Sequence, residues 1–264
     1  VNRYGKASDL QDFCKKAQMV NMENHKAMFE SFVGAHSNGM LMWMSQSAWP
    51  STVWQTYDYY LEQTAGYYGC KKALEPLHIL WDSQLDKVKG YKNFIAEVRI
   101  YNMDGTLMLR DSVRLDSGSD TVTDCMSIVY PKKLSPVHFI KLELKDGNKI
   151  IADNFYWRGN EYQEYSDLSN MLPADLQYSL YRGKSGGKVF LTVDIKNAGK
   201  NIALMTRLKV LRDRSKERVL PVYYSDNYFS LLPGETKQVI LEFNAKDLQG
   251  ENPVLGIEGW NIDY

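Results

Sequence analysis

The sequence predicts a mainly-β chain with two β-sandwiches of similar size, preceded by a helix–strand–helix piece. After Pro76, short runs alternate apolar and polar residues with polar turns between them, two of which contain Asp-Gly, at 104–105 and 146–147, which is typical of a sandwich. Before Pro76, apolar residues recur at three-to-four spacing on both sides of one short apolar run. A helix, a buried strand and a helix in succession indicate a piece of α/β architecture.

The composition excludes several classes of protein. The chain has 32 Lys and Arg residues and 32 Asp and Glu residues, so its formal net charge is zero. It therefore lacks the basic surface that nucleic acids or anionic membranes require. No run of about 18 apolar residues is present, which argues against a bilayer-spanning helix. The three cysteines have no paired spacing and the four histidines are scattered, so we expect buried free thiols, no metal site and no cofactor.

The N-terminal piece has recognisable start and stop signals. Ser8 or Asp9 can cap the first helix, and Gly34 can end it. The apolar run Met40 to Met44 ends in polar residues at Ser45, as a buried parallel strand does where it opens into a site. The predicted elements are a helix over 8–34, a turn at 37–39, a strand over 40–44, a loop over 48–53 and a helix over 57–73.

Period-two alternation places the strands of the two sandwiches. The first sandwich extends to about Trp157, and a polar, tyrosine-rich linker follows it. Leu232 to Glu235 predicts a type II turn in the second sandwich. The predicted strands include 94–101, 107–109, 139–144 and 149–152 in the first sandwich, and 188–197, 208–211, 228–231, 239–243 and 254–260 in the second.

Four phrases carry a family resemblance: NMENHKAMFESF (21–32), GMLMWMSQSAWPS (39–51), YDYYLEQTAGYYGCKKALEPLHI (57–79) and NFYW (154–157). They resemble the C-terminal part of glycoside hydrolase family 2, especially exo-β-glucosaminidases and their β-mannosidase relatives. The resemblance implies that residues 1–75 are the last helix–strand–helix piece of a (β/α)8 TIM barrel. It implies immunoglobulin-like β-sandwiches at 76–160 and 174–264.

Family 2 enzymes are retaining glycosidases with two catalytic glutamates, at the ends of the fourth and seventh barrel strands. By this resemblance both positions lie upstream of Val1, so no catalytic residue is expected here and the chain alone is expected to be inactive. The N-terminal sequence VNRYGKASDLQDF is neither a signal peptide nor a domain start, and suggests a piece of a longer chain. We interpret Glu23 and Glu30 as solvated carboxylates on the helix face.

The loop after the predicted strand contains the candidate substrate contacts, because the βα loops of such barrels build the active site. The candidates are Trp43, Gln46, Ser47 and Trp49. Instead of contacting substrate, Trp43 could pack in the core, and Trp49 could pack between the barrel and the sandwich. The glucosaminidase pattern has two asparagines where this chain has Gln46 and Ser47, so the sugar stays open. Asp58 could bond a sugar hydroxyl or, alternatively, cap the following helix.

The resemblance also implies partners: a β-linked oligosaccharide or glycoside in the full-length parent, and the missing N-terminal part of the barrel. A lone barrel strand leaves an apolar face bare, through which a homodimer could form. The resemblance favours an extracytoplasmic location, periplasmic or secreted, which the residues themselves leave undecided. The alternative function is a non-catalytic carbohydrate-binding or structural β-sandwich module, for which the tyrosines at 162, 165, 178 and 181 could form a sugar platform.

Overall fold

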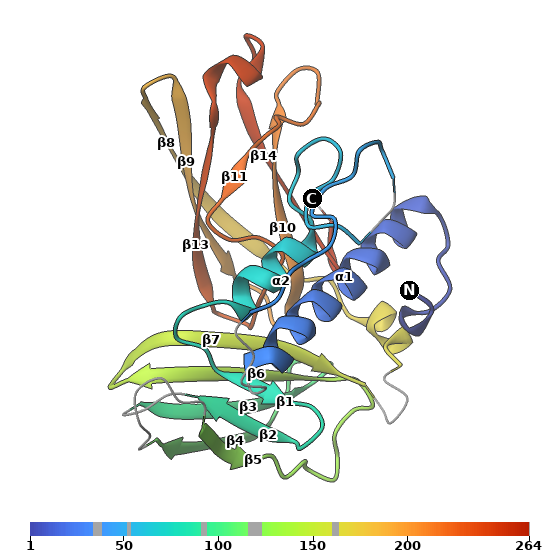
Figure 1. Ribbon diagram of the computed structural model, residues 1–264, viewed down its shortest axis with the longest axis vertical. Coiled ribbons are helices and arrows are strands. Elements are labelled where there is room, and N and C mark those ends of the chain that lie inside the picture. Colours follow the sequence, from blue (N-terminus) through green and yellow to red (C-terminus); the bar gives the residue numbers. More distant parts are fainter. Residues whose placement is uncertain (34–38, 52–53, 91–93, 116–122, 160–163, 264) are drawn as a thin grey trace. The chain divides into compact units, whose positions relative to one another are not determined.

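The computed structural model describes residues 1–33, 39–51, 54–90, 94–115, 123–159 and 164–263 (Figure 1). The chain folds as two compact units, each assembled from separate stretches of sequence. The first unit comprises Val1–Ser8, Asn24–Leu41 and Gly69–Met171, and the second comprises Asp9–Glu23, Met42–Tyr68 and Leu172–Tyr264. The predicted helix end at Gly34, most of the turn at 37–39 and part of the loop at 48–53 lie outside the described residues.

The first helix, α1 (Leu10–Val33), confirms the prediction, and Asp9 is its cap. The Asp9 carboxylate accepts a hydrogen bond from the Asp12 backbone N–H at 2.8 Å, which satisfies one of the open donors of the first turn. Several apolar residues of the helix are exposed, while its buried side carries polar residues beside Met19. The exposed set is Leu10, Phe13, Met28 and Phe32, and the buried polar set is Lys16, Asn21, His25, Lys26 and Glu30. No helix in the described part of the chain is long and apolar enough to cross a membrane.

The predicted buried strand over Met40–Met44 is wrong for this chain. These residues form no strand, and Leu41 and Trp43 are exposed. Met44 has a left-handed backbone, with φ at 63°. A strand is stable only where neighbouring strands pair with its N–H and C=O groups, and no described segment pairs with 40–44.

The second helix, α2 (Ala65–Ala73), is shorter than the predicted helix over 57–73. The Asp58 carboxylate accepts hydrogen bonds from the backbone N–H groups of Tyr60 (2.8 Å) and Glu62 (2.9 Å), which closes a turn instead of a helix. Leu61 in that turn has φ at 65°. The local side-chain bonds of an aspartate therefore compete with the helix and win. Asp58 is the centre of a loop turn rather than a helix cap.

The first unit contains a seven-stranded sandwich (Figure 1). One sheet has the strand order β1-β2-β5 and the other β4-β3-β6-β7, all antiparallel. Val88, Val98, Ile100, Ile140 and Leu142 come from both sheets and form its core, each at most 1% exposed. The strands are β1 (Leu80–Asp82), β2 (Lys87–Gly90), β3 (Ile95–Asn102), β4 (Leu107–Arg114), β5 (Thr123–Ser127), β6 (His138–Asp146) and β7 (Lys149–Arg158).

The second unit contains a sandwich of two four-stranded sheets, ordered β12-β10-β14-β15 and β11-β13-β9-β8. Alternate residues of β9, including Val189, Leu191, Val193 and Ile195, are fully buried. The strands are β8 (Leu176–Ser185), β9 (Lys188–Asn197), β10 (Ala203–Arg212), β11 (Tyr223–Tyr224), β12 (Phe229–Leu231), β13 (Thr236–Asn244), β14 (Pro253–Gly259) and β15 (Ile262–Asp263). Short 3-10 helices span Asn2–Tyr4, Ser166–Asn170 and Ala245–Leu248.

The mainly-β prediction is confirmed, and several strands match closely. The expected strand 188–197 is β9, and 94–101 differs from β3 by one residue at each end. The predicted turn at Leu232–Glu235 is present: the Glu235 N–H donates to the Leu232 carbonyl at 3.0 Å, and Gly234 has φ at 82°. A positive φ at the third position is the property that requires glycine in a type II turn.

The three cysteines are unpaired in the structure but differ in environment. Cys14 is exposed, as are Leu10 and Phe13 on the same face of α1, which corrects the expectation of burial. Burial raises the pKa of Cys70 to about 11 and that of Cys125 to about 12. Since the thiolate is the nucleophile, both should react slowly near neutral pH.

In the native protein, we expect one thiol to react fast with a thiol-reactive disulfide reagent and the other two to react roughly 100-fold more slowly. The Cys14→Ser variant should lose the fast phase alone. In denaturant without reductant, three thiols should titrate. Fewer than three would mean that a disulfide or another modification is present.

Candidate functional site

The candidate site lies on residues 42–64, here called the aromatic loop, which precede α2 in the second unit. Single β-bridges join Tyr57 to Gln46 and to Gln63. The Tyr57 N–H donates to the Ser45 carbonyl at 2.9 Å. These bonds hold Ser45 and Gln46, near the start of the loop, against Tyr57, near its end.

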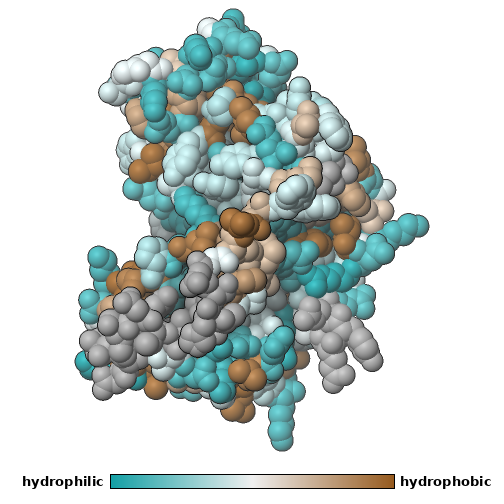
Figure 2. Space-filling view, in the orientation of Figure 1, coloured by the Kyte–Doolittle hydropathy of each residue, from teal (hydrophilic) through white to brown (hydrophobic). Residues whose placement is uncertain are grey.

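The aromatic loop exposes large rings. Trp43 is 82% exposed, Trp49 68% and Trp54 63%, and Tyr59 and Tyr60 meet edge to face at 5.2 Å between ring centres. On the face seen in Figure 2, hydrophobic residues lie in several separate groups among hydrophilic ones. Tryptophan usually buries most of its ring, so three exposed tryptophans in one loop indicate a surface that contacts something else.

The four predicted contact residues share this loop but differ in what they can offer. Trp43, Gln46 and Trp49 are exposed, so the core-packing alternative for Trp43 does not hold in this chain. Ser47 is buried, and its hydroxyl contacts the Gln55 side chain and lies 3.0 Å from the Ser51 hydroxyl. Ser47 therefore shapes the loop from within, while the other three present their side chains to solvent.

Two groups at the base of the loop have shifted pKa values. Burial raises the pKa of Asp58, against the lowering effect of its backbone bonds and of nearby Arg218. Burial, with the neighbouring Tyr57, raises the pKa of Tyr67 to about 12, so its phenol stays protonated at neutral pH. The rings of Tyr57 and Tyr67 lie 5.3 Å apart.

The sequence did not identify Glu62, which the structure shows to be a central residue of this region. Its side chain is buried and forms ion pairs with Arg207 and Arg218. These arginines lie 145 and 156 residues further along the chain, so no local pattern connects them with Glu62.

The first unit has its own buried polar cluster, centred on Glu30. One carboxylate oxygen lies 2.9 Å from His78 Nε2 and accepts hydrogen bonds from Asn154 (2.9 Å) and Tyr156 (2.8 Å). Burial alone would raise the pKa of Glu30, but the charge of Lys26 and these hydrogen bonds outweigh it and lower the pKa. Glu30 is thus a buried structural carboxylate, which corrects its interpretation as solvated.

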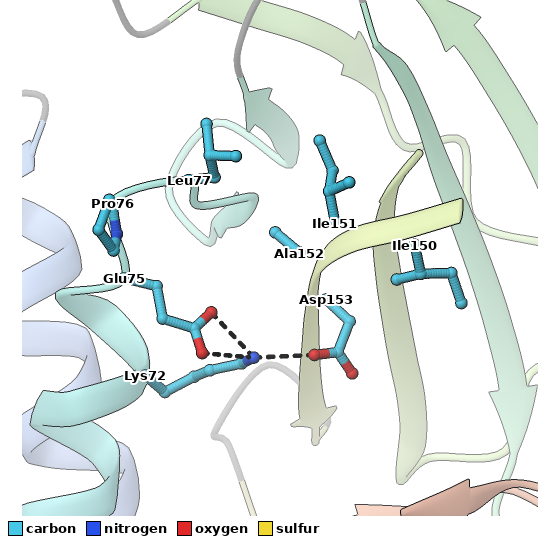
Figure 3. A pocket seen from close by; sticks show the side chains of 8 residues that line it. All are labelled: Lys72, Glu75, Pro76, Leu77, Ile150, Ile151, Ala152 and Asp153. Carbon is cyan, nitrogen blue, oxygen red and sulfur yellow. Dashed lines mark hydrogen bonds and ion pairs between the residues drawn. The ribbon is translucent and has the colours of Figure 1, made fainter. Parts of the chain in front are cut away.

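A cavity of about 400 Å³ lies beside the end of α2 in the first unit (Figure 3). Lys72 and Glu75 face Asp153 of β7 across it, and Lys72 bonds to both carboxylates, at 3.0 and 2.8 Å. The rest of its lining is mainly apolar: Pro76, Leu77, Ile150, Ile151 and Ala152. The charged groups satisfy one another, so the cavity offers no free nucleophile or base.

Comparison with known proteins accounts for this combination of elements. Residues 154–262 match the family model of the exo-β-D-glucosaminidase Ig-fold domain. The structure of the exo-chitosanase CsxA from Amycolatopsis orientalis matches with a TM-score of 0.88 at 29% identity, covering 99% of this chain and 35% of that one. The chain matches the C-terminal part of a glycoside hydrolase family 2 enzyme.

Two curated relatives also match almost the whole of this chain. The exo-β-D-glucosaminidase of A. orientalis is 31% identical over 99% of this chain, and the mannosylglycoprotein endo-β-mannosidase of Lilium longiflorum is 26% identical over 98%. The chain covers 29% of the first and 34% of the second. It therefore spans about a third of the length of these relatives.

Proposed function

We propose that this chain is the C-terminal part of a retaining family 2 exo-β-glycosidase that hydrolyses O-glycosyl bonds. The observation that carries the proposal is the match to an exo-chitosanase along 99% of the chain with a TM-score of 0.88. Under this proposal residues 1–75 complete a (β/α)8 barrel, and the units at 76–160 and 174–264 are its immunoglobulin-like sandwiches. The two catalytic glutamates belong to barrel strands outside these residues.

The exposed side of α1 supports this assignment. Leu10, Phe13, Met28 and Phe32 are between 37% and 73% exposed, although such residues are usually buried in a folded protein. Residues 40–44, which lead into the aromatic loop, likewise expose apolar side chains and pair with no described strand. In the proposed enzyme the rest of the barrel covers the helix and pairs with the run, which would then become the strand that its sequence suggests.

The proposed substrate is a β-linked glycoside whose sugar contacts the aromatic loop. Trp43 and Trp49 offer apolar ring faces, and Gln46 offers an amide that can both donate and accept hydrogen bonds. Apolar faces and directed polar groups together are what a sugar ring requires. One relative is named as a glucosaminidase and the other as a mannosidase, so both sugar classes are candidates for this site.

A carbohydrate-binding module is the second candidate, but its tyrosine platform is poorly supported. Tyr165 is buried and packs on Tyr4, with 5.0 Å between ring centres, and Tyr162 lies outside the described residues. Tyr178 and Tyr181 are exposed on β8 but are three residues apart, so they project from opposite faces of the strand. Two rings on opposite faces cannot form one platform.

We expect residues 1–264 alone to hydrolyse no chromogenic β-glucosaminide, β-mannoside, β-galactoside or β-glucuronide. Retaining hydrolysis needs one carboxyl to protonate the leaving oxygen and another to attack the anomeric carbon, about 5 Å apart. The buried carboxylates of Glu30 and Glu62 are already bonded to neighbouring side chains. Turnover above background that a point substitution within the chain abolishes would refute the proposal.

A further inference from the structure

The Glu62 ion cluster, consisting of Glu62, Arg207, Arg218 and Glu258, joins the base of the aromatic loop to the second sandwich. Glu62 is 7% exposed and pairs through one carboxylate oxygen with Arg207 and through the other with Arg218. Arg207 also bonds to Glu258 on β14, at 2.6 Å. A buried carboxylate is costly unless charged donors satisfy it, so the loop residue is stable only in contact with both arginines.

The sandwich holds both arginines in place. Arg207 is in β10, and its guanidinium lies over the Tyr228 ring at 5.5 Å. The Asn227 side chain accepts from the Leu208 N–H at 2.7 Å and donates to the Leu208 carbonyl at 3.0 Å, which fixes the segment that carries Tyr228. Arg218 is bridged to Leu211 of the same strand. The sandwich therefore fixes the backbone of both arginines and the position of the Arg207 guanidinium.

On the loop side, Glu62 closes the turn that carries the candidate contacts. The Asp58 N–H donates to the Glu62 carbonyl at 3.0 Å, and the Glu62 N–H donates to the Asp58 carboxylate at 2.9 Å. The residue before Asp58, Tyr57, is bridged to Gln46. A continuous set of bonds thus leads from the arginines of the sandwich to a predicted sugar contact.

A row of tyrosine rings in edge-to-face and tilted contact provides a second connection between the same two elements. Tyr57 lies 5.3 Å from Tyr67, and Tyr67 lies 5.0 Å from Tyr68, between ring centres. Tyr68 lies 5.9 Å from Tyr228, the ring beneath Arg207. Both connections end on β10 and the segment that follows it, so the sandwich and the loop are coupled at two points.

We propose that the second sandwich is a positioning element for the substrate pocket, and that Glu62, Arg207 and Arg218 are positioning residues that fix the aromatic loop for sugar binding. This role rests on the proposed function, in which the loop contacts the sugar. Without the ion cluster the loop base is free to shift, and the enzyme must order it again each time it binds substrate. The loss should therefore appear in KM more than in kcat.

The first experiment measures hydrogen exchange of the 264-residue chain and does not depend on any activity. Glu62→Gln and Arg218→Gln should speed exchange of the Tyr57, Asp58 and Thr64 amides by at least about tenfold, since each removes a charge-assisted bond. Arg218→Lys should restore most of the protection, and amides of β9 and β13 should be unchanged. Glu217→Gln is the matched control: it removes a carboxylate from Arg212 of β10, outside the ion cluster, and should leave exchange of the three loop amides unchanged. Equal exchange in Glu62→Gln and in the unaltered chain would overturn the proposal.

The second experiment measures kinetics of the complete enzyme on the chromogenic glycoside it hydrolyses best. Glu62→Gln and Arg218→Gln should each raise KM roughly three- to tenfold with little change in kcat, whereas Arg218→Lys, which keeps the charge, should leave KM close to the original value. A loop that exchanges faster while KM stays unchanged would overturn the positioning role. A complete protein that hydrolyses no glycoside would instead refute the proposed function, and the exchange data would still decide whether the ion cluster holds the loop.

Discussion

Replacing Glu30 with alanine is expected to destabilise the first unit by about 3 to 5 kcal/mol, the usual cost of removing one member of a buried charged cluster. The carboxylate is the shared acceptor for Asn154 and Tyr156 and the partner of His78. Alanine would leave these polar groups buried without it. The loss should appear in denaturant unfolding, and in faster hydrogen exchange of β6 and β7.

Glu217→Ala is the matched control, because Glu217 also pairs with an arginine, Arg212, at 2.6 Å. Its side chain is 71% exposed, so solvent screens the pair and its removal should cost less than about 1 kcal/mol. Similar losses for the two variants would show that the Glu30 cluster contributes no more than a surface ion pair.

The lowered pKa of Glu30 also predicts how the free energy of unfolding changes with pH. An unfolded glutamate titrates near 4.5, and the folded carboxyl titrates below it, so the unfolded chain binds the proton more readily. The stabilisation by ionised Glu30 is therefore complete above the pKa of the unfolded glutamate, and it is lost as the pH falls through the pKa of the folded carboxyl. Glu30→Gln should flatten this part of the curve of unfolding free energy against pH.

The second large effect is expected in the complete enzyme, where Trp49→Ala should lower kcat/KM about fivefold and Gln46→Ala by a similar factor. A ring stacked on a sugar and one hydrogen bond to it are each worth about 1 kcal/mol. Trp49 and Gln46 are exposed in the chain, so thermal unfolding should change little. The measurement is steady-state kinetics with thermal unfolding of the same samples.

Tyr181→Ala is the control for these variants, since Tyr181 is 62% exposed on β8 and lies outside the aromatic loop. It should leave the kinetic constants unchanged. If Trp49→Ala and Gln46→Ala also retain them, or lose activity only because they unfold, the sugar pocket lies elsewhere.

The sandwiches were predictable because their signal is local. Alternation along 188–197 already specifies which residues of β9 are buried, and a glycine with positive φ specifies the turn at 232–235. The helix α1 was predictable for the same reason, from the spacing of its apolar residues. That spacing did not reveal which side of the helix is covered, because this depends on other segments.

The incorrect predictions mostly concern interactions between distant residues, and the Asp58 turn is a local exception. Met40–Met44 has the composition of a buried strand but no described neighbour with which to pair. The Asp58 turn displaces the start of α2, because side-chain bonds to Tyr60 and Glu62 replace helical ones. Glu62 itself looks like an ordinary surface glutamate in the sequence, and only the fold brings its arginines to it.

The most direct measurement is hydrolysis of a chromogenic β-glucosaminide and β-mannoside by three proteins. They are the complete enzyme, residues 1–264 alone, and the enzyme from which residues 1–264 have been removed. The account predicts turnover by the complete enzyme with retention of the anomeric configuration, and none by either piece. Full activity in the truncated protein would contradict it, because residues 1–264 would then contribute nothing to the active site.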